Sequence, residues 1–187
     1  MRAKPGVPQG WMSKAERKWL TKQAKNVRGL AIEVGSWRGR STVAIVAGLS
    51  HSTGLLYAVD TWAGPPDGGG QADIYEGKTG VYAEFLANLA APIRAGTVVP
   101  LRMDSLAGAA EIQRLHGLAC ADLIFIDADH RYEGVHADIL AYLPLLRVGG
   151  VICGHDYRAK FPGVIQAVNE LLPIAKVGAD TIWCARP

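Results

Sequence analysis

The strongest fold signal in this 187-residue chain comes from two segments, Asp122-Leu-Ile-Phe-Ile-Asp127-Ala-Asp129-His130-Arg-Tyr132 and Gly149-Gly-Val-Ile-Cys-Gly154-His155-Asp156-Tyr157. In each segment a short, β-branched apolar run stops abruptly at ionisable residues. This pattern is typical of a buried parallel strand that delivers side chains to the carboxyl edge of a sheet. Because the active sites of open α/β sheets lie at that edge, the segments predict two neighbouring strands that end in carboxylate and imidazole groups.

The remaining sequence alternates between strand and helix patterns. Strands are predicted at residues 30–34, 55–59, 97–101, 123–126 and 151–153, and helices at residues 42–49, 82–90, 106–115, 133–143 and 164–172. This alternation predicts an α/β fold with a doubly wound, mostly parallel sheet and helices on both faces. Residues 174–177 and 181–184 are too close for a crossover helix, so we expect a C-terminal antiparallel hairpin that completes a seven-stranded sheet.

The length predicts a single domain over residues 1–187. Ser13 followed by Glu16 is a capping-box pattern, so residues 1–28 are expected to form a helical N-terminal segment, with the helix over residues 13–27. Residues 62–80 are rich in glycine and proline. An irregular stretch of this length is more often a lid over a site than a plain connection.

The amino-acid composition of the chain limits the kinds of partner that we expect it to bind. The chain has 49% hydrophobic and 20% charged residues with a net charge of +3, which is typical of a soluble globular domain. The basic excess falls within residues 1–28 with little aromatic interleaving, so it indicates a solvated helix face, and we expect no nucleic-acid partner. No apolar run reaches about 18 residues, so we expect a cytoplasmic chain with no membrane partner. The three cysteines lack CxxC spacing, which argues against a disulfide framework or a zinc site.

A second group of residues predicts a nucleoside site. Glu33-Val-Gly35-Ser-Trp-Arg-Gly39-Arg-Ser41 follows the first strand and opens a helix, so its glycines admit a ligand to free backbone N–H groups. Asp60 ends the second strand, where a carboxylate either accepts hydrogen bonds from ribose hydroxyls or caps the following loop. Asp104 and Ser105 follow the third strand, where they either contact an adenine or cap the next helix.

Asp127, His155 and Asp156 form the predicted metal site. Carboxylate-rich clusters suit Mg²⁺ or Mn²⁺, and a histidine ligand favours manganese. His130 lies three residues beyond Asp127, close enough to serve as a proton acceptor whose pKa is near neutral pH. The alternative is that these residues are helix caps and hydrogen-bond partners at the strand ends.

Together these segments resemble the class I S-adenosylmethionine-dependent methyltransferases, in particular macrocin-type sugar O-methyltransferases and cephalosporin hydroxylase-like proteins. The resemblance is carried by residues 32–41, 57–62, 122–134 and 149–157 and extends over nearly the whole chain. It implies a Rossmann-like fold, a divalent metal on Asp127, His155 and Asp156, and a base at His130, where catechol-type enzymes place a lysine. It also implies that S-adenosylmethionine is held by Glu33, Gly35, Ser36, Gly39, Ser41, Asp60, Thr61, Asp104, Ser105 and Asp127.

We therefore predict an O-methyltransferase that methylates a hydroxyl of a sugar, polyketide or phenol, with Asp127 and His130 as catalytic residues. One alternative is a nicotinamide-dependent oxidoreductase. It is disfavoured by the closing hairpin and because the glycines do not follow the dinucleotide pattern G-x-G-x-x-G. The other alternative is a non-catalytic module that binds S-adenosylmethionine. The acceptor, the identity of the metal and the formation of a homo-oligomer are left open by the sequence.

Overall fold

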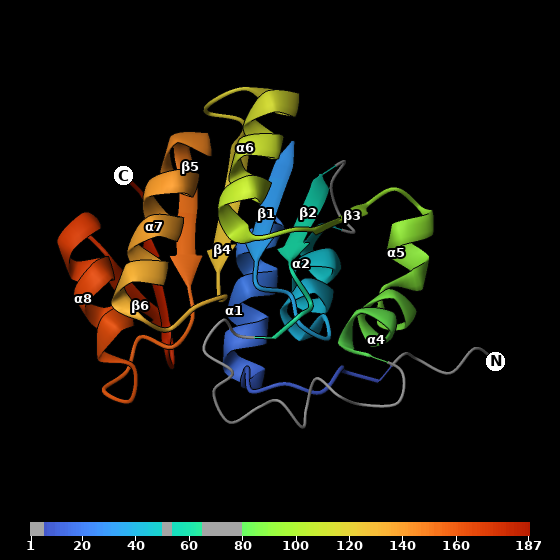
Figure 1. Ribbon diagram of the computed structural model, residues 1–187, viewed down its shortest axis with the longest axis horizontal. Coiled ribbons are helices and arrows are strands. Elements are labelled where there is room, and N and C mark those ends of the chain that lie inside the picture. The colour runs from blue at the N-terminus through green and yellow to red at the C-terminus, as the bar shows by residue number, and fades with distance from the viewer. Residues whose placement is uncertain (1–5, 50–53, 65–79) are drawn as a thin grey trace.

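The computed structural model describes residues 6–49, 54–64 and 80–187, which form a seven-stranded sheet flanked by helices (Figure 1). The strands are β1 (Leu30–Val34), β2 (Leu55–Asp60), β3 (Val98–Arg102), β4 (Ala121–Ile126), β5 (Leu146–Gly154), β6 (Lys176–Ala179) and β7 (Ile182–Ala185). Their order across the sheet is β3-β2-β1-β4-β5-β7-β6, and β7 runs antiparallel to both of its neighbours. The predicted α/β fold with a closing hairpin is confirmed.

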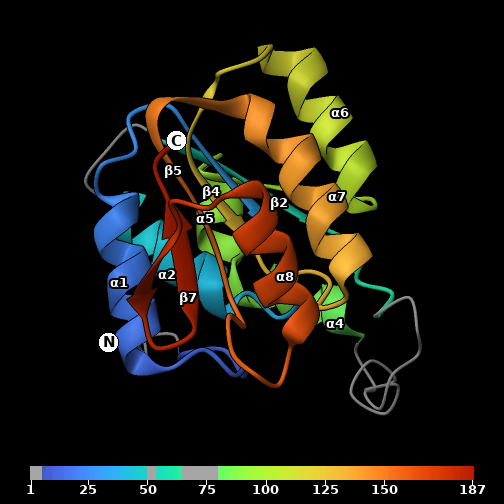
Figure 2. The same cartoon turned by 90° about the vertical axis from the view of Figure 1, so that its left-hand side faces the viewer.

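Helices cover both faces of the sheet (Figure 2). One face carries α1 (Lys14–Ala24), α2 (Arg40–Leu49), α4 (Val81–Asn88) and α5 (Ala90–Arg94), and the other carries α6 (Ser105–His116), α7 (Tyr132–Tyr142), the short 3₁₀ helix Leu143–Leu145 and α8 (Pro162–Leu171). Successive residues of a strand point to opposite faces, so Leu123 and Phe125 of β4 pack toward α1 and α2. Ile124 and Ile126 pack toward α6, α7 and α8.

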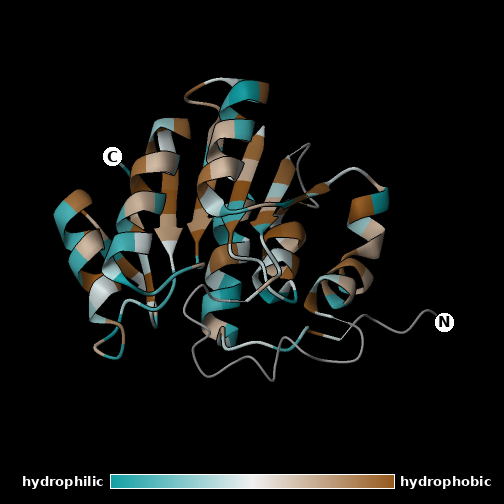
Figure 3. Cartoon of the chain, viewed as in Figure 1, coloured by the Kyte–Doolittle hydropathy of each residue, from teal (hydrophilic) through white to brown (hydrophobic). Residues whose placement is uncertain are grey.

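The hydropathy of the elements follows from these layers (Figure 3). The strands are hydrophobic along most of their length, whereas the helices carry hydrophilic residues on the side that faces away from the sheet. Strands β1 and β4 are buried at every position. A strand that is buried on both of its side-chain faces is expected to be apolar at most positions, and these two strands are apolar except at Glu33 and Asp122.

The strand order changes direction between β1 and β4, because the chain first moves outward to β3 and later continues from β4 in the opposite direction. In open α/β sheets a crevice for ligands forms at such a switch point, beyond the carboxyl ends of the strands. Val34 at the end of β1 pairs with Ile126 at the end of β4. The next residues, Gly35 and Asp127, therefore leave the sheet side by side at that edge.

Several element boundaries differ from the predicted ones. Strand β5 begins at Leu146 and not at the predicted residue 151. The sequence pattern misses the first positions of this strand because they are mostly exposed and form no apolar run. The hairpin strands lie one or two residues later than predicted, since the turn falls at Asp180, which has a positive φ of 44°. The predicted helix over residues 82–90 divides at Leu89 into α4 and α5, and α1 ends at Ala24.

The N-terminal segment contains the predicted capping box. Glu16 N donates to Ser13 Oγ at 3.1 Å, and Ser13 N donates to Glu16 Oε2 at 2.7 Å. Of the predicted lid over residues 62–80, residues 65–79 lie outside the described residues. Within the described part of the chain, none of the helices has both the length and the apolar character that a membrane crossing requires.

Candidate active site

A cavity of about 820 Å³ opens at the carboxyl edge of the sheet, where the sequence predicts the site. Its wall includes the ends of β1, β2, β4 and β5, the starts of α6 and α7, and residues 10–12 before α1. The predicted residues that line it are Gly35, Ser36, Ser41, Asp60, Thr61, Asp104, Ser105, Asp127, His130, His155 and Asp156. Two predicted cofactor residues, Glu33 and Gly39, are not part of this wall.

The turn after β1 brings the backbone of Gly35 close to the backbone of Asp127. Gly35 has a φ of +87°, and a Cβ atom at this position would lie 2.3 Å from the carbonyl oxygen of Asp127. Asp127 N in turn donates to Val34 O at 2.7 Å. A side chain at residue 35 would therefore push apart the two strand ends that form the floor of the cavity.

Replacing Gly35 with alanine is expected to destabilise the protein more than the same change at Gly96. Both glycines have positive φ, but a Cβ at Gly96 meets no atom within 4 Å. The left-handed backbone alone costs about 1–2 kcal/mol, and the clash at Gly35 adds about 1–3 kcal/mol of overpacking. Urea unfolding of the two variants measures this difference, and equal destabilisation would contradict the close approach of Gly35 to Asp127.

Asp60 organises the turn as well as facing the cavity. Its Oδ2 accepts hydrogen bonds from Ser36 N and Trp37 N at 2.8 Å each, and its Oδ1 accepts one from Trp62 N at 2.6 Å. Burial raises the pKa of Asp60 above its ordinary value, against the effect of these hydrogen bonds. Asp60 therefore caps the loop, the alternative role that the sequence offered, and it also lines the cavity.

Glu33 and Gly39 support the turn from beneath. Glu33 is fully buried, and its Oε2 accepts hydrogen bonds from Ser36 Oγ at 2.7 Å and Thr42 Oγ1 at 2.6 Å. Burial raises the pKa of Glu33 to about 7. At Gly39 a Cβ atom would lie 2.3 Å from Leu89 Cδ2, so this glycine permits the packing of α2 against the start of α5.

Asp104 and Ser105 lie at the start of α6. Asp104 Oδ1 accepts a hydrogen bond from Ala107 N at 2.9 Å, so its side chain is the helix cap that the sequence offered as an alternative. Ser105 O accepts a hydrogen bond from the hydroxyl of Tyr142 at 2.7 Å. Both residues nevertheless line the cavity, on the side opposite the histidines.

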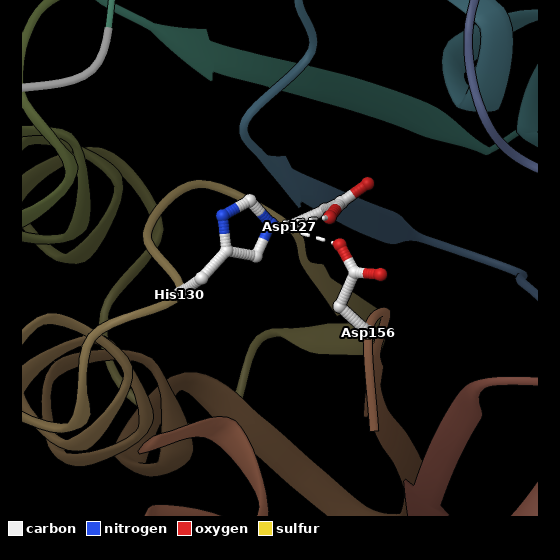
Figure 4. A group of neighbouring side chains, drawn as sticks. All are labelled: Asp127, His130 and Asp156. Carbon is white, nitrogen blue, oxygen red and sulfur yellow. Dashed lines mark ion pairs between the residues drawn. The ribbon is translucent and has the colours of Figure 1, made fainter. Parts of the chain in front are cut away.

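Three polar side chains converge at the other side of the cavity (Figure 4). One ligand-type atom from each of Asp127, His130 and Asp156 lies within 4.8 Å of the others. His130 Nε2 is 2.9 Å from Asp156 Oδ2 and 4.0 Å from Asp127 Oδ1. Asp156 has a φ of 60°, a conformation that is uncommon outside glycine and is found preferentially at functional sites.

His155 approaches the same carboxylates from the protein interior. Its Nδ1 is 3.7 Å from Asp127 Oδ1 and 3.5 Å from Asp156 Oδ2. Its side chain is only 6% exposed, compared with 39% for His130. The three-residue cluster thus contains His130 in the place where the sequence predicted His155, because the segment after β4 folds back toward the end of β5.

Glu16 is a site-supporting residue that the sequence analysis treated only as a helix cap. Its Oε1 accepts hydrogen bonds from Thr181 N at 3.0 Å and Thr181 Oγ1 at 2.8 Å, while its Oε2 lies 3.2 Å from His155 Nε2. This one buried carboxylate joins α1, the closing hairpin and the end of β5. No local pattern predicts it, since both partners are distant in the sequence.

Burial and ion pairing act in opposite directions on the pKa values of this cluster. Burial alone would lower the pKa of His155, but Asp127, Asp156 and Glu16 raise it to about 10. Burial raises the pKa of Asp127 to about 6, despite the opposing effect of His155. The hydrogen bond to Asp156 raises the pKa of His130, and burial opposes it. Burial would likewise raise the pKa of Asp156, but the hydrogen bonds from both histidines hold it well below its usual range.

Replacing Glu16 with glutamine is expected to remove a pH-dependent part of the stability. Burial opposes ionisation of Glu16, yet hydrogen bonds from His155, Ser13 and Thr181 lower its pKa from 4.5 to about 2. A lowered pKa contributes stability above pH 4.5 that is lost as the pH falls toward 2, on the order of 3 kcal/mol in all. Urea unfolding between pH 7 and pH 3 should show wild type converging toward Glu16→Gln, and a constant gap would contradict this contribution.

A family profile described as a methyltransferase domain matches residues 32–157. The chain belongs to this methyltransferase family. The matched region runs from β1 to the residue after Asp156, and so contains the glycine turn, Asp60 and the carboxylate–histidine cluster. Membership confirms the predicted methyltransferase and sets aside the oxidoreductase alternative. The match is to a methyltransferase domain and does not single out the macrocin-type or cephalosporin hydroxylase-like proteins. A comparison with curated proteins found no match.

Solved structures of methyltransferases share the fold. An O-methyltransferase from Bacillus cereus in complex with S-adenosylhomocysteine (SAH) has 20% sequence identity and a TM-score of 0.66, with 97% of this chain and 84% of that chain covered. A cofactor-bound protein from MTB has 21% identity, the same TM-score of 0.66 and the same coverage of 97% and 84%. The TDP-rhamnose 3′-O-methyltransferase of calicheamicin biosynthesis has 18% identity and a TM-score of 0.62, with 91% and 76% covered.

Proposed function

We propose that this methyltransferase uses S-adenosylmethionine to methylate a hydroxyl of a small molecule, with Asp127 and Asp156 holding a divalent metal and His130 accepting the hydroxyl proton. The observation that carries the proposal is the meeting of Asp127, His130 and Asp156 in the same cavity as the glycine turn. Methyl transfer requires the methyl donor and the group that removes the proton to lie close together. This one cavity contains residues proposed for both roles.

The cofactor part rests on the turn after β1. S-adenosylmethionine supplies an electrophilic methyl group on a sulfonium centre. In our proposal Gly35 and Ser36 lie against its methionine part, and Asp60 accepts a hydrogen bond from its ribose. Asp104 and Ser105 lie where the third strand ends, which suits a contact with the adenine. Glu33 and Gly39 act indirectly, because they support the turn without lining the cavity.

The donor set fits a divalent ion. Asp127 and Asp156 offer carboxylate oxygens that lie within 4.8 Å of each other and of a ring nitrogen of His130. Carboxylate oxygens suit Mg²⁺ or Mn²⁺, and His130 is left beside the ion as the base. A bound ion would lower the pKa of the acceptor hydroxyl and fix its orientation, contributions that together are worth about several kcal/mol of barrier. His155 presents Nδ1 to both carboxylates, so it either completes the ligand set or positions the two carboxylates.

His130 is placed to act as the base. Its side chain is 39% exposed, which leaves it accessible from the cavity. Asp156 fixes one ring nitrogen, and the ring stacks on Phe161 with a centroid separation of 4.5 Å. A carboxylate that orients an imidazole also stabilises the imidazolium that forms when it accepts a proton.

The acceptor proposal rests on the aromatic wall of the cavity. Trp11 and Trp37 line it and stack with their ring centroids 4.6 Å apart. Flat aromatic surfaces bind sugar rings, polyketide rings and phenols, so the proposed acceptor is a hydroxyl compound of one of these classes. The resemblance to macrocin-type enzymes, and the TDP-rhamnose named for one structural neighbour, favour a sugar hydroxyl.

Replacing Asp60 with alanine is expected to weaken SAH binding by about 1.5–3 kcal/mol, the range for losing hydrogen bonds to a charged group. Calorimetric titration measures this change. Because Asp60 also holds the turn, the titration is repeated with an SAH analogue that lacks the ribose 2′-hydroxyl. The analogue should bind wild type more weakly than SAH does, but the two should bind Asp60→Ala equally. Unchanged SAH affinity in a folded Asp60→Ala protein would remove the ribose assignment.

A further inference from the structure

A second cavity, of about 640 Å³, forms a groove between α1 and α2. The two helices lie side by side in both views (Figures 1 and 2), and Thr21 Oγ1 donates to Ala44 O at 2.8 Å across their contact. None of the lining residues is acidic. Six of them are cationic: Lys14, Arg17, Lys18, Lys22, Lys25 and Arg40. Those on α1 recur every three or four residues, so they form one stripe along the helix.

These cations have no acidic partners among the described residues. None of the six takes part in the ion pairs that join described side chains. The one acid on α1, Glu16, is instead engaged with His155 and Thr181. Arg17 Nε is buried without a hydrogen-bond partner in the described structure. Burial and the charge of Arg17 both lower the pKa of Arg40, so the two guanidinium groups repel each other.

We propose that this groove binds the phosphate groups of a ligand that carries at least two of them. Six like charges around one groove require counter-charge, and a polyanion supplies it more effectively than separate monovalent ions. Guanidinium groups match phosphate oxygens in a two-pronged arrangement, and lysines add point charges around them. The stripe on α1 would let successive phosphates contact successive turns of the helix.

The groove is joined to the active-site cavity through Arg40, which lines both. Arg40 Nε donates to Met12 O and Arg40 Nη1 to Pro8 O, each at 2.8 Å, so it also holds the segment that carries Trp11. A ligand anchored by its phosphates in the groove would extend past Arg40 toward the aromatic wall. This inference rests on the proposed function and specifies its acceptor as a hydroxyl compound that bears phosphate groups.

Tripolyphosphate is the first probe, titrated by calorimetry at low salt, once without SAH and once with it. The test variant is Lys18→Glu/Lys22→Glu. The matched control is Arg94→Glu/Lys176→Glu, which changes the net charge equally at exposed positions that do not line the groove. We expect the groove variant to bind about ten-fold or more weakly, since each exposed charge pair contributes about 0.2–1 kcal/mol. The control variant should retain wild-type affinity, and affinity should fall as salt is added.

Further probes define the ligand. UDP represents a nucleotide-linked acceptor, and coenzyme A represents a pantetheine-linked one. If either binds more tightly than tripolyphosphate, and the groove variant loses this binding, that probe identifies the source of the phosphates. No binding of tripolyphosphate, or equal loss in both double variants, would overturn the proposal. Binding of hexaglutamate or duplex DNA in place of tripolyphosphate would also overturn the proposal. It would indicate instead a surface for an acidic protein or a nucleic acid. This readout requires no methyl transfer, so it tests the groove separately from the proposed function. Tripolyphosphate can bind when SAH does not, and it can fail to bind when SAH does.

Discussion

Replacing His130 with alanine is expected to lower kcat by about 10²–10⁴-fold, the range that a general base typically contributes. His130 Nε2 lies 2.9 Å from Asp156 Oδ2, and its ion pairs among the described residues are with Asp127 and Asp156 and not with the glycine turn. The affinity for SAH should therefore change little. Turnover is measured with labelled S-adenosylmethionine and an acceptor found by screening, and cofactor binding is measured separately by calorimetry.

The pH profile provides a second readout of the same residue. Asp156 raises the pKa of His130 above its ordinary 6.5, against the effect of burial. A base must be neutral to accept a proton, so kcat should fall as the pH drops through this raised pKa, and the midpoint of the acidic limb should lie above pH 6.5. The alanine variant should lose this limb.

His136→Ala is the matched control. His136 lies on α7, its Nε2 is 3.8 Å from Glu170 Oε1, and it does not line the cavity. This variant should keep both wild-type kcat and the acidic limb. Full activity of His130→Ala across the pH range would mean that His130 has no catalytic part, and loss of metal from that variant would make it a ligand.

Removing the divalent metal is expected to abolish turnover, and adding Mg²⁺ or Mn²⁺ should restore it. The charge of the ion is what lowers the hydroxyl pKa, so its loss should cost about several kcal/mol of transition-state stabilisation. Asp127→Ala and Asp156→Ala should behave like metal-free enzyme, and Asp156→Ala should retain SAH binding. Asp129→Asn is the control, because Asp129 is paired with Arg131 at 2.6 Å and is not part of the cluster. Full turnover after exhaustive chelation, with elemental analysis to confirm it, would refute the metal mechanism.

The fold was largely predictable because β1 and β4 are buried on both faces. Mostly apolar runs, interrupted only by Glu33 in β1 and Asp122 in β4, end at Val34 and Ile126 and leave little choice about where the strands stop. The failures occur where burial is incomplete. Strand β5 has exposed residues at its start, and the turn of the hairpin depends on Asp180 adopting a positive φ, which the apolar pattern does not encode.

The site was predictable at the strand ends and less so beyond them. Asp60 is the last residue of β2, Asp127 directly follows β4, and Asp156 lies two residues beyond β5, so the sheet itself brings them to one edge. The position of His130 depends on how the segment after β4 folds back, and the contact of Glu16 with His155 depends on where α1 docks. Such long-range contacts leave no periodic signal in a single sequence.

Mn²⁺ titration followed by electron paramagnetic resonance, in the presence of SAH, tests the central claim most directly. The signal of free Mn²⁺ decreases when the ion binds, so the method counts sites without requiring an acceptor. The account predicts one site in wild type and in Asp129→Asn, and loss of that site in Asp127→Ala and Asp156→Ala, with SAH affinity unchanged in Asp156→Ala. Absence of Mn²⁺ and Mg²⁺ binding by wild type, or a site that persists in both alanine variants, would contradict a metal held by Asp127 and Asp156.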